Sequence, residues 1–207
     1  RGTLLYKIYL IYHLFIRYKI FLRNRKSFSQ FGEDLFINEF FKDKQIGKYV
    51  DLGAFHPMRL NNTYLLYKKG WSGTNIDLNQ TSIDMFNFVR KRDVNICALI
   101  SDKGGVEKKA YFQHDWSAGN TAVLDEDFKK VLKKEKTMVS EIFDKLISHN
   151  FDFLNIDLEG HDYDVLKTID LDKYNPKLIC IEILRKSTSG EKIFDYMKKF
   201  NFKFIKQ

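Results

Sequence analysis

Apolar and polar residues follow two different periods along most of the chain. Short, nearly continuous apolar runs are typical of buried strands in a parallel sheet. They alternate with runs whose apolar residues stand three and four positions apart, as in amphipathic helices. The pattern predicts strands over residues 49–52, 74–77, 94–100, 106–112, 153–158, 178–183 and 202–205. It predicts helices over residues 35–41, 64–70, 81–90, 125–136, 138–150, 164–169 and 190–199.

This alternation predicts an α/β fold, a doubly wound and mostly parallel sheet with helices on both faces. Because right-handed crossovers place the carboxyl ends of parallel strands at one edge of the sheet, a ligand is expected to bind at that edge. Residues 106–112 alternate in the manner of an edge strand. We expect one such domain over residues 29–207, preceded by a helical extension over residues 1–28.

The extension is apolar and aromatic over residues 4–25, but basic residues interrupt it. Its longest charge-free run, residues 8–16, is far shorter than the roughly 20 residues that a membrane-spanning helix needs. The segment also lacks the small-residue cleavage site of a signal peptide. Two interpretations of the predicted helix stay open. It packs on the domain or on a second copy of the chain, forming a homodimer, or it lies on an anionic membrane surface.

Composition narrows the expected fold, the expected partners and the expected location of the protein. A hydrophobic fraction of 44% in 207 residues indicates a packed globular domain rather than a disordered chain. The net charge of +8 suits a lysine-rich solvated surface or an anionic partner, but no RNA-binding pattern accompanies it, so we expect no nucleic acid. Cys97 and Cys180 lie in apolar runs and are expected to be reduced thiols, which predicts a cytoplasmic protein, peripheral if residues 4–25 contact a membrane.

Small and polar residues gather where the predicted strands end. The first strand is followed by a turn of small residues, and the later strands deliver acids and imidazoles to the same edge. These strand-end residues are Gly53, Ala54, His56, Asp77, Ala98, Asp157, Glu159, His161 and Glu182. Their convergence predicts a single cleft, with a turn that lets a ligand approach the backbone and an acid, Asp77, placed to accept ribose hydroxyls.

Four stretches together carry a family resemblance: Ser-Gln-Phe-Gly-Glu-Asp at 29–34, Val-Asp-Leu-Gly-Ala at 50–54, Asn62-Thr63 with Gly-Trp-Ser-Gly at 70–73, and Ile-Asp-Leu-Glu-Gly at 156–160. The chain resembles the FkbM family of S-adenosylmethionine-dependent methyltransferases, within the class I, Rossmann-like superfamily. Two features depart from it. His56-Pro57 stands where dinucleotide-binding loops carry another glycine, and the chain stops before the seventh, antiparallel strand of that superfamily.

The resemblance implies S-adenosylmethionine as cofactor and a place for each of its parts. Its methionine portion would lie over Asp51, Gly53 and Ala54, although Asp51 could instead brace the loop. Asp77 would accept the ribose hydroxyls. The remaining contacts would come from Leu78, Ala98 and Leu99 beside adenine, and from Gln30, Glu33 or Asn62 at the amino-acid end.

A methyl acceptor must also lose a proton, so a base is needed near the strand ends. Asp157 is the first candidate, with Glu159, His56 and His161 as alternatives. A second interpretation makes His56, Asp157 and Glu182 the ligands of a divalent metal, Mg²⁺, Mn²⁺ or Fe²⁺, that would orient a sugar diol.

The predicted function is O-methylation of a carbohydrate or sugar nucleotide in the biosynthesis of a capsule, a lipopolysaccharide or a natural product. A polar loop with His114, Asp115, Trp116 and Asn120 suits a sugar, Trp116 offering a stacking surface. Two alternatives stay open: a nucleotide-sugar or nicotinamide enzyme of the same fold, and a non-catalytic membrane-associated or dimerising domain. Pyrophosphate binding is disfavoured because Gly53 is the only glycine between Gly47 and Gly70.

Overall fold

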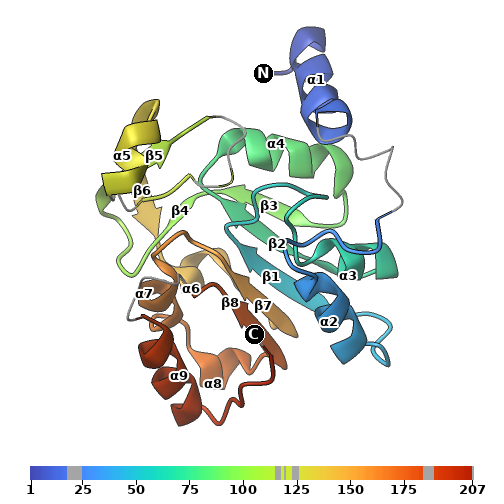
Figure 1. The fold of residues 1–207 in the computed structure, drawn as a ribbon, viewed down its shortest axis with the longest axis vertical. Helices are drawn as coiled ribbons and strands as arrows, with labels where there is room; N and C mark the ends of the chain where they lie inside the picture. Colours follow the sequence, from blue (N-terminus) through green and yellow to red (C-terminus); the bar gives the residue numbers. More distant parts are fainter. Residues whose placement is uncertain (18–24, 115–117, 119, 123–125, 184–188, 207) are drawn as a thin grey trace.

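The computed structural model describes residues 1–17, 25–114, 118, 120–122, 126–183 and 189–206. Its centre is a five-stranded parallel sheet in the order β3-β2-β1-β7-β8 (Figure 1). The strands are β1 (Lys48–Leu52), β2 (Ser72–Asp77), β3 (Val94–Cys97), β7 (Phe153–Ile156) and β8 (Leu178–Ile181). The order of the strands reverses beside β1, and a sheet of this type binds ligands at such a reversal.

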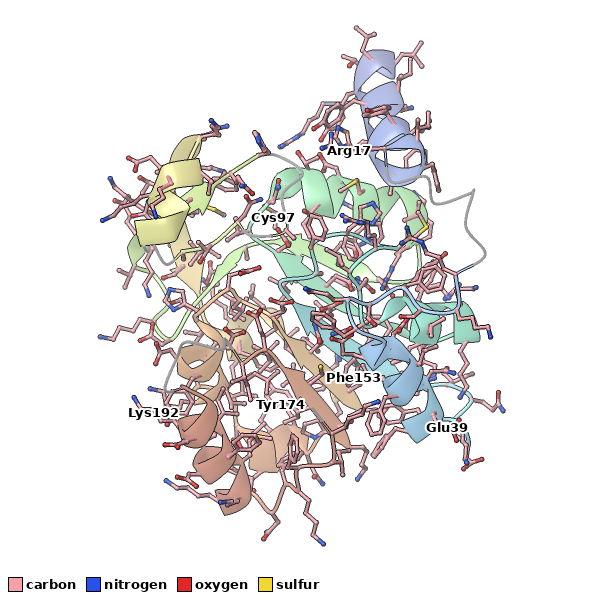
Figure 2. The ribbon with its side chains drawn as sticks, in the orientation of Figure 1. Arg17, Glu39, Cys97, Phe153, Tyr174 and Lys192 are labelled. Atoms are coloured by element: carbon pink, nitrogen blue, oxygen red, sulfur yellow. The ribbon has the colours of Figure 1, made fainter. Side chains whose placement is uncertain are left out.

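The central strands are hydrophobic on both faces because helices cover both. Val50 and Leu52 of β1 belong to one core cluster, whereas Tyr49 belongs to another, as the two-residue period of a strand requires. Phe153 of β7 lies with Tyr49, and Tyr174 lies in the opposite cluster (Figure 2). The doubly wound α/β fold predicted from the sequence is confirmed.

Two groups of helices form these layers (Figure 1). The Tyr49 side is covered by α2 (Glu33–Phe40) and α3 (Tyr64–Lys69), and α4 (Gln80–Val89) follows β2. The Val50 side is covered by α6 (Phe143–Leu146), α7 (Asp162–Leu166), α8 (Leu171–Tyr174) and α9 (Ser189–Lys199).

A second sheet corrects three predictions. It has the order β4-β6-β5 and contains β4 (Leu99–Ile100), β5 (Glu107–Phe112) and β6 (Lys134–Glu141). The predicted strand 94–100 is therefore two strands, which belong to different sheets. The predicted helices 125–136 and 138–150 are shorter in the structure, as α5 (Glu126–Val131) and α6. Residues 134–139 pair antiparallel with β5, and residues 140–141 pair in parallel with β4.

The predicted strand 202–205 is also wrong. The Phe202 N–H donates to the Met197 carbonyl, so the chain turns back onto α9 instead of joining the sheet. Phe204 and Ile205 are more than half exposed, and residues 202–205 have no regular secondary structure.

The helical extension packs on the domain. It consists of α1 (Leu4–Ile11), whose first turn is capped by the Thr3 hydroxyl, and a π-helical turn, η1 (Tyr12–Ile16). Residues 18–24 of the predicted helix lie outside the described residues. In the described parts of the chain no helix is both long and apolar enough to cross a membrane. Cys97 and Cys180 are free thiols.

Candidate active site

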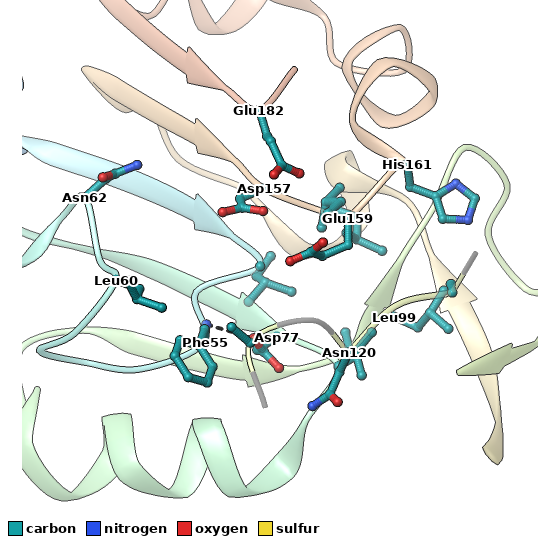
Figure 3. A pocket seen from close by; sticks show the side chains of 18 of the residues that line it. Phe55, Leu60, Asn62, Asp77, Leu99, Asn120, Asp157, Glu159, His161 and Glu182 are labelled. Atoms are coloured by element: carbon teal, nitrogen blue, oxygen red, sulfur yellow. Dashed lines mark hydrogen bonds between the residues drawn. The ribbon is translucent and has the colours of Figure 1, made fainter. Parts of the chain in front are cut away.

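A cleft open to solvent lies at the carboxyl edge of the central sheet (Figure 3). Its lining comes from the exits of β1, β2, β7 and β8, from the segment joining β3 to β4, and from the loop after β5. The edge predicted from the strand alternation is therefore where the structure has its cleft.

Gly53 makes the turn that opens the cleft after β1. Its φ of +78° is in the left-handed region, and a Cβ added there would lie 1.7 Å from the backbone oxygen of Asp157. The Gly53 and Ala54 N–H groups both donate to the Ile76 carbonyl. Only glycine lets the β1 exit approach the β7 exit this closely.

Asp77 lies at the end of β2 and holds the turn from the other side. Its Oδ2 accepts the Phe55 N–H at 2.8 Å and its Oδ1 accepts the Asn79 N–H at 2.7 Å (Figure 3). Burial raises the pKa of Asp77 to about 6 despite these bonds. Each carboxylate oxygen keeps a further lone pair, so the side chain can both brace the loop and accept hydroxyls from a ligand.

Asp51 and Ala54 were predicted to lie beneath the methionine portion of the cofactor, but their side chains do not reach the cleft. Both are buried, and neither lines the cleft. The Asp51 carboxylate accepts hydrogen bonds from Asn155 at 2.9 Å, Thr63 at 2.9 Å and Asn61 at 3.3 Å. Of the two roles considered for Asp51, this geometry favours bracing of the loop over contact with a cofactor.

The other predicted cofactor contacts all line the cleft. Gln30 and Glu33 stand at one end of it, together with Asn62, whose amide donates to Asn155 Oδ1 at 2.9 Å. Leu78, Ala98 and Leu99 supply an apolar wall. Their roles toward a bound cofactor stay predictions.

Three acids lie together on one side of the cleft. Asp157, Glu159 and Glu182 come from the exits of β7 and β8 and point toward its interior (Figure 3). Burial and then the neighbouring Glu182 hold the pKa of Asp157 well above its usual range. Burial raises the pKa of Glu159 and of Glu182 to about 7, and a neighbouring charge adds to the effect, that of Asp157 for Glu159 and that of Glu159 for Glu182.

The loop after β7 fixes the backbone conformation at Glu159. Glu159 has a φ of +50°, and the Asp162 carboxylate accepts the N–H groups of Leu158 and Gly160 at 2.8 and 3.0 Å. His161 also lines the cleft, and burial lowers the pKa of its imidazole, which favours the neutral ring at pH 7.

His56 does not join these acids. Its side chain is fully buried, its Nδ1 accepts the Met58 N–H at 3.0 Å, and it is absent from the cleft lining. Among the described residues no three His, Cys, Asp or Glu side chains are grouped to hold a metal ion. The predicted ligand set of His56, Asp157 and Glu182 is therefore not assembled, and His56 is not placed to act as a base.

The loop after β5 covers part of the cleft, as predicted. Ala118, Asn120 and Ala122 line it, and the Thr121 hydroxyl donates to the Glu159 carbonyl at 3.1 Å. Asn120 bonds Gln113 and His114 within the loop. Asp115 and Trp116, which were predicted to contact a sugar, lie outside the described residues.

Comparison with known proteins settles the family. Residues 46–204 match the family model described as the methyltransferase FkbM domain. The chain belongs to this family. The crystal structure of methyltransferase FkbM from Methylobacillus flagellatus KT has a similar fold, with a TM-score of 0.51 and 17% sequence identity. That match covers 75% of this chain and 37% of the other, so the chain spans little more than a third of that protein's length. No protein of curated function matches the chain.

Several cleft residues of this FkbM domain escaped the sequence reasoning. Phe55 and Leu60 line the cleft with φ values of +50° and +46°, and an apolar run gives no signal of a left-handed backbone. The pair Asn61-Asn62 was the available clue, because asparagine side chains stabilise such loops by bonding nearby backbone groups. Here Asn61 Oδ1 accepts the Thr63 N–H at 3.0 Å.

The FkbM cleft is acidic although the whole chain is basic. Five carboxyl side chains line it, and none of its described lining residues is lysine or arginine. These five are Glu33, Asp77, Asp157, Glu159 and Glu182. The net charge of +8 therefore lies outside the cleft, which itself favours cationic or neutral ligands.

Proposed function

We propose that the chain is an S-adenosylmethionine-dependent methyltransferase that methylates a hydroxyl group of a carbohydrate. The observation that carries the proposal is the position of Asp77. It lies at the end of β2, beside the glycine turn that follows β1, and faces the cleft of an FkbM domain. A carboxylate at this point of a doubly wound sheet is well placed to accept two ribose hydroxyls.

The rest of the cofactor follows from the same arrangement. Leu78, Ala98 and Leu99 offer an apolar wall for the adenine ring. Gln30 and Asn62 supply amides for the amino-acid end, beyond Gly53. The acidic lining suits this cofactor because its sulfonium is positively charged. Nothing in the turn from Gly53 to Asn62 resembles a glycine-rich loop for pyrophosphate, which argues against a dinucleotide.

The acids at the exits of β7 and β8 supply the base. The bound cofactor would provide a methyl group on its own leaving group, so the protein has to align the acceptor and remove its proton. Asp157 is backed by Glu182, and Glu159 stands beside them, all three with a raised pKa. A carboxylate whose pKa approaches 7 accepts a hydroxyl proton more readily than an ordinary one does.

The charge of the cleft also narrows the acceptor. A phosphate placed beside Asp157, Glu159 and Glu182 would meet acids and no described basic side chain. We therefore favour a neutral sugar hydroxyl at the reacting position. A sugar-nucleotide acceptor would have to keep its phosphates outside the cleft.

Calorimetric titration of the cofactor tests the proposal. S-adenosylmethionine and S-adenosylhomocysteine are expected to bind, and NAD is not. Asp77→Ala should lose about 1–3 kcal/mol of binding free energy, because the ribose hydroxyls lose their acceptor. Asp195→Ala, at an exposed acid of α9 that pairs with Lys198 and does not line the cleft, is the control and should bind normally. Failure of both methionine cofactors to bind the wild type would reject the proposal, and tight NAD binding would favour a nicotinamide enzyme.

A further inference from the structure

The helical extension presents two apolar faces, and the domain covers only one of them. On the covered face, Leu10 and Leu14 are buried against Met58 and Met85. The Tyr6 hydroxyl donates to Asp84 of α4, which fixes the helix to the domain in one orientation. The packing predicted for this segment therefore explains one side of the helix and leaves the other unexplained.

The opposite face exposes large apolar side chains in a continuous row. Leu4 is 74% exposed, Leu5 79%, Ile8 53% and Ile16 60%. Residues 4, 8, 12 and 16 are spaced by four and so lie along one side of the helix, and Tyr12 within this row is 43% exposed. Such a row on a folded domain indicates a surface that a membrane or another molecule covers.

The charge of the surrounding sequence identifies that partner. Residues 1–32 contain seven basic residues and no acidic one. The seven are Arg1, Lys7, Arg17, Lys19, Arg23, Arg25 and Lys26. An apolar helix face within an acid-free basic segment is complementary to a bilayer with anionic headgroups, which takes up both the apolar side chains and the cations.

We propose that the exposed row of α1 and η1 docks on the surface of an anionic lipid bilayer. The helix over residues 4–16 lies in the plane of the interface, because it is too short to span the hydrocarbon core. The contact does not depend on the reaction proposed above. It would nevertheless bring the cleft near the bilayer, since Met58 packs under the helix and Leu60, two residues further on, lines the cleft.

Co-sedimentation with vesicles tests the docking. The 207-residue chain is expected to bind vesicles of phosphatidylcholine mixed with phosphatidylglycerol, and to bind pure phosphatidylcholine far more weakly. Added salt should weaken the binding. The double variant Leu5→Ser/Ile8→Ser should lower the partition constant by about tenfold for each side chain removed. Ile46→Ser is the matched control, because Ile46 is 75% exposed in the loop before β1, and it should bind like the wild type.

Both sets of variants change exposed side chains, so thermal unfolding should be unchanged and loss of folding cannot mimic loss of binding. Three results would overturn the proposal: no binding to anionic vesicles, equal binding to neutral and anionic vesicles, or full binding by the double variant. A wild-type dimer in sedimentation velocity that the double variant converts to a monomer would also overturn it, because a second copy of the chain would then be the partner.

Discussion

Gly53→Ala is the substitution that the geometry of the cleft constrains most. The added methyl group would lie 1.7 Å from the Asp157 carbonyl oxygen, much closer than any real contact. That oxygen cannot move aside easily, because the Asp157 N–H donates to the Leu52 carbonyl at 3.0 Å and continues the pairing of β7 with β1. The turn after β1 must shift instead, and with it the position of Asp157.

The expected cost has three parts. A left-handed backbone costs alanine about 1–2 kcal/mol relative to glycine. Overpacking against a fixed neighbour adds about 1–3 kcal/mol. The reduced freedom of the unfolded chain returns about 0.4–1 kcal/mol. We therefore expect Gly53→Ala to lower the free energy of unfolding by about 1–5 kcal/mol. It should also reduce methyl transfer more than tenfold through the displaced Asp157.

Gly105→Ala separates the cost of the left-handed backbone from the cost of overpacking. Gly105 has nearly the same φ, +75°, but an added Cβ would have no heavy atom within 4 Å. It should cost only about 1 kcal/mol and leave turnover unchanged. Urea denaturation followed by fluorescence and circular dichroism measures both variants. If their unfolding free energies agreed within about 0.5 kcal/mol, the close approach of the β1 and β7 exits would not be what fixes glycine at position 53.

Three further predictions concern buried charge. Arg90→Met should lower the free energy of unfolding by about 3–5 kcal/mol, since the buried Asp93 carboxylate loses its cationic partner and the Pro57 carbonyl loses its donor. Arg92→Met, at an exposed site, should cost less than about 1 kcal/mol in the same urea assay. The rate of methyl transfer should rise with pH through about 7, as the acids with a raised pKa ionise. Glu182→Gln should move the midpoint of the pH–rate profile to lower pH, because it removes a like charge beside Asp157. An unmoved midpoint would exclude this pair as the titrating group. The free energy of unfolding of the cofactor-free protein should fall by up to about 2 kcal/mol as the pH rises from 4 to 6. The reason is that folded Asp77, with a pKa of about 6, keeps a proton that the unfolded chain has already released. Chemical denaturation at several pH values measures this fall, and Asp77→Asn should reduce it.

The parts of the site that sequence reasoning located share a simple physical cause. Gly53, Asp77, Asp157 and Glu182 each follow a short apolar run, and parallel strands bring such exits to one edge whatever the details of the loops. The same reasoning cannot orient a side chain within a loop. His56 follows β1 as closely as Phe55 does, but its ring is buried against Met58 whereas Phe55 reaches the cleft.

The failures of the secondary-structure prediction also have a physical cause. Apolar side chains stand at helical spacing from Met138 to Ile147, but α6 begins only at Phe143. Residues 134–139 of β6 pair with β5 in an antiparallel ladder, from Glu107 opposite Val139 to Phe112 opposite Lys134, and residues 140–141 pair with β4. Such pairing joins residues that are far apart in the sequence, so the local spacing of apolar residues does not predict it.

Asp51 shows why stretches of a family motif that lie apart in the sequence belong together. Its carboxylate binds Asn61 and Thr63, and the Arg90 guanidinium donates to the same two side chains, at 2.6 Å to Asn61 Oδ1 and 2.8 Å to Thr63 Oγ1.

This buried network closes the segment from Asp51 to Thr63 into a rigid loop, and Phe55, Leu60 and Asn62 reach the cleft from that loop. An acid at position 51 therefore shapes the site although its side chain does not line the cleft. On this argument Asp51→Asn should weaken cofactor binding only as far as it loosens the loop. Lower thermal stability should accompany any loss of affinity. Weaker binding at unchanged stability would instead indicate that Asp51 contacts the cofactor directly.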